Sequence, residues 1–162
     1  MRSDVDTIRA LPLLLGLLML AGCSGYAIEG RVVRGPSPSV MVVDSDDPRL
    51  TELNTTGSGA AIEGVLEPNT PTERQTLGRF VADEQGWFAI PVDAIGSGLL
   101  EYEALLIARR DGNQGAMGTI ELPRRGQRVL ITLPLGADTL IVPESFRDQA
   151  LRDARPYLDD NR

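Results

Sequence analysis

Residues 83–92, Asp-Glu-Gln-Gly-Trp-Phe-Ala-Ile-Pro-Val, combine a tight turn with an alternating strand. Gly86 stands where a hairpin loop needs a left-handed backbone, which a residue with a Cβ adopts only with strain. Beyond the turn, side chains alternate across the strand, so that Phe88, Ile90 and Val92 share one face, which we expect to lie in the core. The opposite face, expected to point outward, holds Trp87, Ala89 and Pro91.

Strand-like segments of the same kind recur along the chain. They are residues 27–34, 39–44, 61–67, 76–83, 87–92, 100–109, 116–122 and 128–134. Clusters of Gly, Pro, Asn and Asp, which are typical of turns, separate them. Seven or eight short strands at this spacing predict an all-β fold, an antiparallel sandwich formed as one domain by residues 27–136.

The composition excludes several kinds of chemistry. The 162 residues include neither His nor Lys, so all 16 basic residues are Arg. Catalytic triads, His-ligated zinc sites, Schiff-base lysines and P-loops are therefore excluded. A net charge of -7 with scattered arginines argues against a nucleic-acid partner. With 42% hydrophobic residues, the chain is nevertheless expected to form an ordinary folded domain.

The N-terminal segment has the pattern of an export signal. A short head with two arginines precedes an apolar run over residues 11–20, which is too short to span a bilayer. Residues 20–23, Leu-Ala-Gly-Cys, resemble the lipobox of bacterial lipoproteins. The resemblance implies that the signal is cut before Cys23 and that this residue is acylated. The alternative is a core helix in which Cys23 simply packs.

The lipobox resemblance also implies a location. Residues 1–22 are expected to be a signal peptide and residues 23–26 a lipidated linker, and two or three acyl chains suffice for stable anchoring. Ser24, in place of Asp, implies sorting to the outer membrane. We therefore expect the protein in the cell envelope, lipid-anchored at the periplasmic face of the outer membrane or at the cell surface. With Cys23 acylated, the single Cys is consumed and no disulfide can form.

Residues 137–162 are expected to form a tail with a short helix. Ser145 and Asp148 have the spacing of a capping box. One helical face would carry Phe146, Ala150, Leu151, Ala154 and Leu158. This pattern predicts an amphipathic helix that covers an end or an edge of the sandwich, or, as the alternative, one that binds a partner.

Three motifs occur in order along the predicted domain. They are Ile-Glu-Gly-Arg-Val-Val at 28–33, Gly-Ala-Ala-Ile-Glu-Gly-Val at 59–65 and Asp-Glu-Gln-Gly-Trp-Phe-Ala-Ile at 83–90. Together they resemble the carboxypeptidase regulatory-like domain, which implies a transthyretin-like Greek-key sandwich of about seven strands. That domain is an accessory one, and the enzymes of similar fold, hydroxyisourate hydrolases and intradiol dioxygenases, need His. Relative to the family, residues 36–58 form a long insertion and residues 93–98 form a loop longer than a tight turn. A specific function is expected in these two loops.

Three carboxylates within this insertion are a candidate calcium site. Asp44, Asp46 and Asp47 could supply oxygen ligands with help from a neighbouring loop. The alternative, which we favour, is a cluster of Asx turns leading into Pro48, because calcium sites usually need more ligands at defined spacing.

Trp87 is a candidate sugar-stacking platform, since alternation places it on the outer face of its strand. The alternative is an aromatic side chain covered by the long insertion or by the terminal helix.

The sequence as a whole predicts an exported, lipid-anchored, non-catalytic β-sandwich of the cell envelope that uses no cofactor. Its expected role is structural or in protein interaction, and its expected partners are the membrane, through the lipid on Cys23, and an envelope protein. A glycan-binding lipoprotein that uses Trp87 is the alternative function. A weak hydrolase that uses paired carboxylates comes third, because no pair stands out in the spacing.

Overall fold

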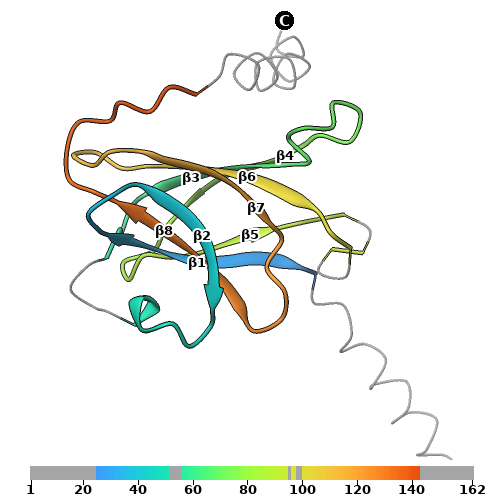
Figure 1. Ribbon diagram of the computed structural model, residues 1–162, viewed down its shortest axis with the longest axis horizontal. Helices are drawn as coiled ribbons and strands as arrows, with labels where there is room; N and C mark the ends of the chain where they lie inside the picture. The colour runs from blue at the N-terminus through green and yellow to red at the C-terminus, as the bar shows by residue number, and fades with distance from the viewer. Residues whose placement is uncertain (1–24, 52–55, 95, 98–99, 143–162) are drawn as a thin grey trace, which may run out of the picture.

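The described part of the protein consists of β-strands in two layers (Figure 1). The computed structural model describes residues 25–51, 56–94, 96–97 and 100–142. Its strands are β1 (Ala27–Arg34), β2 (Ser39–Asp44), β3 (Ala61–Leu66), β4 (Gln75–Val81), β5 (Trp87–Pro91), β6 (Glu103–Arg109), β7 (Ala116–Glu121) and β8 (Gln127–Leu133). A short 3₁₀ helix, η2 (Pro48–Leu50), follows β2. The predicted all-β class is confirmed.

The strands form two four-stranded sheets that pack face to face. One sheet has the order β2-β8-β1-β5 and the other the order β4-β3-β6-β7. β2 lies near β7 at one side of the sandwich, and β5 approaches β4 at the other. In the first sheet no strand pairs with its neighbour in the sequence, whereas the second sheet joins two hairpins, β3–β4 and β6–β7, through the pairing of β3 with β6.

One strand pair differs from the predicted antiparallel arrangement. β1 and β8 are parallel, with Gly30 opposite Val129, whereas every other pair among the described strands is antiparallel. The cause is the position of β8. Residues 35–38 join β1 to β2, which run in opposite directions, but β8 lies between them and is antiparallel to β2. A strand between two opposed neighbours must be parallel to one of them, so this sheet is mixed.

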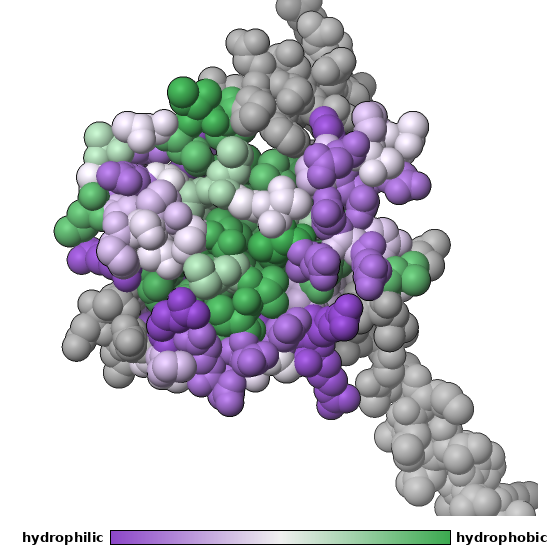
Figure 2. All heavy atoms as spheres, in the orientation of Figure 1, coloured by the Kyte–Doolittle hydropathy of each residue, from purple (hydrophilic) through white to green (hydrophobic). Residues whose placement is uncertain are grey.

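The core lies between the two sheets and is built from the inward side chains of each strand. Phe88, Ile90 and Val92 are buried, as predicted. The two sheets also contribute Ile28, Val32, Ile62, Leu106, Val129 and Ile131. Full burial of one such side chain stabilises the fold by about 1.5–3 kcal/mol. In the view of Figure 2, apolar residues gather toward the middle of the face and hydrophilic residues toward its rim.

Two glycines are required by backbone geometry. Gly86 has a φ of 84°, as the turn motif predicts, and its N–H donates to the Asp83 carbonyl. At Gly30 the reason is space instead, because a Cβ there would lie 2.3 Å from the Val129 carbonyl oxygen. Gly30 therefore allows β8 to pack closely against β1.

The short helix η2, which lies within the long insertion, packs on the outer face of the sheet over β1, β2 and β8. Leu50 of η2 is buried there on a second apolar cluster that comprises Val33, Val43 and Leu130, with Met41 packed against it. The outer face of this sheet is therefore only partly exposed, which alternation alone does not predict.

Two predictions fall on parts of the chain outside the described residues. These are the signal peptide with Cys23, in residues 1–24, and the amphipathic helix, in residues 143–162. Among the residues that the structure describes, no helix has the length and apolar character needed to cross a bilayer.

Candidate functional site

Trp87 lies on the outer face of β5, directly opposite Arg31 of β1. Trp87 is 37% exposed, whereas Arg31 is only 1% exposed. The Arg31 guanidinium carbon lies 5.6 Å from the centre of the Trp87 ring. At this distance a cation and an indole ring attract each other. The predicted outward direction of Trp87 is confirmed.

Arg31 holds two segments against the sheet through backbone carbonyls. Its Nε donates to the Gln85 carbonyl oxygen at 2.8 Å, and its Nη1 donates to the Leu50 carbonyl oxygen at 2.6 Å. Among the described residues it has no carboxylate partner. A buried cation without such hydrogen bonds is strongly destabilising, so these carbonyls and the indole ring must compensate for lost solvation. Arg31 therefore connects η2, the β4–β5 loop and Trp87.

A shallow hollow of about 400 Å³ lies beside Trp87. Glu29, Asp83 and Arg128 provide its polar groups, and Phe88 and Ala89 complete the lining. Arg128 Nη2 lies 2.9 Å from Glu29 Oε2, and both side chains are partly exposed. The hollow thus combines one aromatic ring with carboxylate acceptors and a guanidinium donor. This set suits a ligand that has both an apolar face and several hydroxyl groups.

Asp83 also shapes the hollow through its backbone contacts. Its Oδ1 accepts from the N–H of Gln85 at 2.9 Å and from the N–H of Trp87 at 2.8 Å. These two bonds close the turn before β5 and set the position of the Trp87 backbone. The turn motif found in the sequence therefore also builds one wall of the candidate site.

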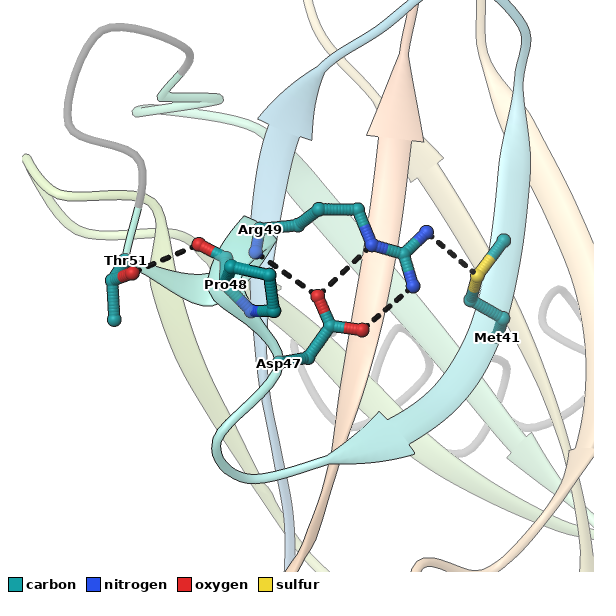
Figure 3. A network of polar contacts seen from close by, with 5 residues as sticks. All are labelled: Met41, Asp47, Pro48, Arg49 and Thr51. Atoms are coloured by element: carbon teal, nitrogen blue, oxygen red, sulfur yellow. Dashed lines mark hydrogen bonds and ion pairs between the residues drawn. The ribbon is translucent and has the colours of Figure 1, made fainter.

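The structure does not bring Asp44, Asp46 and Asp47 together as a metal site. Asp47 faces Arg49 instead (Figure 3): its carboxylate accepts from the Arg49 backbone N–H at 3.0 Å and lies 2.7 Å from Nη2. Hydrogen bonds from the Arg49 side chain and then from its backbone hold the pKa of Asp47 below the ordinary value. Within the described ranges, no group of three or more acidic, His or Cys side chains is placed to hold a metal ion. The arrangement favours the Asx-turn interpretation.

Tyr26 fastens the start of the domain to the β7–β8 turn. Its hydroxyl donates to the Pro123 carbonyl oxygen at 2.8 Å, across 97 positions of sequence. Burial raises the pKa of Tyr26 to about 12. Neither Tyr26 nor Arg31 stood out in the sequence. The period-two pattern does place Arg31 on the same face as Trp87, but only the packing of η2 buries it.

Comparisons with known proteins identify no relative: no family model matches the chain, and neither a curated protein nor a solved structure matches it significantly. The resemblance of its three motifs to the carboxypeptidase regulatory-like domain therefore stays a prediction.

Proposed function

We propose that this protein is an exported, lipid-anchored, non-catalytic module of the cell envelope, attached to the membrane through Cys23 and acting through contact with an envelope protein. The transthyretin-like Greek-key topology and the terminal helix belong to the same proposal. The observation that carries it is the short distance along the chain from the lipobox to the folded domain. β1 begins at Ala27, and Tyr26 is already bonded to Pro123, so only Ser24 and Gly25 separate Cys23 from that contact.

This attachment sets the orientation of the domain relative to the membrane. With so few residues between lipid and fold, the β7–β8 turn and the start of β1 face the bilayer. The opposite end of the sandwich, with the β6–β7 turn, then points away from the membrane. The composition supports a non-catalytic role, because no imidazole or lysine amine is available as a general base or nucleophile.

Replacement of Cys23 tests the anchor. We expect the wild-type chain, expressed at full length in a diderm bacterium, to incorporate an alkyne-labelled palmitate and to stay in the membrane fraction after a carbonate wash. Cys23→Ala should incorporate no label and should no longer be found in the washed membrane fraction. Ser24→Ala, a neighbouring change outside the lipobox, should incorporate the label and stay in that fraction. If Cys23→Ala remains with the washed membranes, the lipid anchor is wrong.

A second candidate function is carbohydrate binding at the hollow beside Trp87. The observation that favours it is the combination of a partly exposed indole with the Glu29–Arg128 pair around one hollow. Aromatic rings stack on the apolar faces of sugars, while carboxylates and guanidinium groups bond their hydroxyls.

A glycan array with wild type and three variants tests this second function. Wild type should bind a restricted set of glycans, Trp87→Ala should lose them, and Trp87→Phe should retain weaker binding because an aromatic face remains. Met117→Ala removes an equally exposed apolar side chain from the other sheet and should bind as wild type does. The absence of wild-type binding, or equal losses in Trp87→Ala and Met117→Ala, would dispose of the sugar site and leave the protein-contact role.

A further inference from the structure

A second hollow, of about 700 Å³, lies at the end of the sandwich formed by the β6–β7 turn. Three arginines line it: Arg79 near the end of β4, Arg109 at the end of β6, and Arg110 immediately after it. Gly59, Gly112 and Gly136 add no side chains to the lining. In a chain with a net charge of -7, the convergence of three guanidinium groups on one hollow is unexpected.

The hollow lies at the end of the sandwich away from the start of the domain. The β6–β7 turn and the β7–β8 turn are at opposite ends of β7, and Tyr26 contacts the latter. The arginine-lined hollow is therefore at the end of the sandwich opposite to the N-terminal attachment. A ligand there would come from the side away from the lipid anchor.

Arg109 forms a fixed wall of the hollow. Its Nε lies 3.6 Å from Asp138 Oδ2, and its Nη2 donates to the Leu140 carbonyl oxygen. The other oxygen of Asp138 accepts from the backbone N–H groups of Gly115 and Leu140. The negative charge of Asp138 is thus already satisfied, and it holds residues 138–140 against the β6–β7 turn.

The other two guanidinium groups remain available. Arg79 Nε is 4.0 Å from Glu63 Oε1, and both side chains are well exposed, so this pair contributes little. Arg110 is half-buried, and its guanidinium forms no hydrogen bond or ion pair within the described part of the chain, although its backbone carbonyl accepts from the Asn113 N–H. Asp111, which is exposed, is the nearest acidic neighbour along the chain and partly offsets their charge.

We propose that this hollow binds an oxyanion, a phosphate or carboxylate group of a soluble ligand, held by Arg110 and Arg79 with Arg109 as the fixed wall. A guanidinium presents donors in a planar fork that matches two oxygens of a carboxylate or phosphate. Half-burial of Arg110 strengthens such a contact, because the surrounding protein reduces solvent screening. An anion would also supply the partner that this guanidinium lacks in the described residues.

Isothermal titration calorimetry of the full-length chain in mild detergent, with inorganic phosphate and with citrate as separate probes, tests the site. At least one probe should bind, and the stronger of the two identifies the oxyanion class. Arg110→Gln should weaken that binding about tenfold or more, as the loss of a charge-assisted hydrogen bond implies. Asp111→Asn should tighten it, because a competing negative charge is removed.

Arg125→Gln is the matched control. It makes the same change of charge on an exposed arginine in the β7–β8 turn, outside the hollow, and should leave the affinity within twofold of wild type. Circular dichroism melting of each variant separates a lost site from a lost fold. No binding of either probe up to about 10 mM, or an equal effect of Arg125→Gln and Arg110→Gln in folded proteins, would overturn the proposal.

Discussion

The guanidinium of Arg31 lies 5.6 Å from the centre of the Trp87 ring, and the two residues are direct partners across the β1–β5 register. One member of this pair is buried and the other is partly exposed. The same guanidinium bonds the carbonyls of Leu50 and Gln85, so the exposed ring is connected to two loops through one buried cation. The position of the candidate ligand platform therefore depends on a residue that a ligand would not touch.

Arg31→Ala should destabilise the protein by about 2–4 kcal/mol, because it leaves the buried Leu50 carbonyl and the partly buried Gln85 carbonyl unpaired and opens a cavity. Urea unfolding measures this directly. Trp87 is the only Trp of the chain, so its fluorescence reports the local environment without interference. The emission should change in the folded variant. Arg125→Ala, an exposed change, should stay within about 0.5 kcal/mol of wild type. A similarly small effect of Arg31→Ala would show that η2 is held by its apolar contacts alone.

Gly30→Ala should disrupt the parallel contact between β1 and β8. The added Cβ would lie 2.3 Å from the Val129 carbonyl oxygen and 2.6 Å from Cζ of Phe88, and neither group can move freely. We expect a loss of about 1–3 kcal/mol in the free energy of unfolding, the usual cost of overpacking. Gly25→Ala is the control, since a Cβ there meets no atom within 4 Å. Equal stability of the two variants would contradict the close approach of these strands.

Local patterns account for much of the fold. β1 and β2 have the predicted bounds, Phe88 and Ile90 are buried, and Gly86 is left-handed, because alternation and turn chemistry depend on neighbouring residues. β6 begins at Glu103 rather than at the predicted residue 100. There, Leu100 forms only an isolated bridge with Ser97, which interrupts the apolar run before the strand starts.

Non-local contacts account for what the sequence could not predict. The position of β8 between β1 and β2 could not be predicted, because the alternation of side chains along a strand does not determine which strands pair. The burial of Arg31 depends on where η2 packs. The hollow that contains Arg79 and Arg110 exists because β4 and β6 both pair with β3, which brings Arg79 and the end of β6 to the same end of the sandwich. Of the candidate site, Trp87 and the turn before it were predicted, whereas Glu29 and Arg128 join it only through the register of β1 with β8.

Removal of calcium should leave the melting temperature unchanged. Asp47 is engaged by Arg49, and no three-carboxylate group is assembled among the described residues. Asp47→Asn should lower the melting temperature equally with calcium and with a chelator, because it weakens the contacts to Arg49 and removes no metal. A rise in melting temperature that grows with added calcium would instead show binding to the folded state and would restore the calcium interpretation.

Tyr26 should give the protein a distinctive loss of stability at high pH. Burial raises the pKa of Tyr26 to about 12, so the folded state keeps a proton that the unfolded chain releases near the ordinary value of 10.0. The resulting stabilisation is complete below pH 10.0 and is lost as the pH rises through the window up to about 12. In a titration followed by phenolate absorbance, one of the three tyrosines should therefore ionise late, and Tyr26→Phe should remove that step.

The Tyr26→Phe variant should also be less stable at neutral pH by about 0.5–1.5 kcal/mol, since the bond to the Pro123 carbonyl is lost. Its stability should fall less steeply than that of wild type at alkaline pH. If no tyrosine of the folded wild type ionises later than the ordinary pKa of 10.0, Tyr26 is not held against the β7–β8 turn, and the close attachment of the domain to its N-terminal segment is wrong.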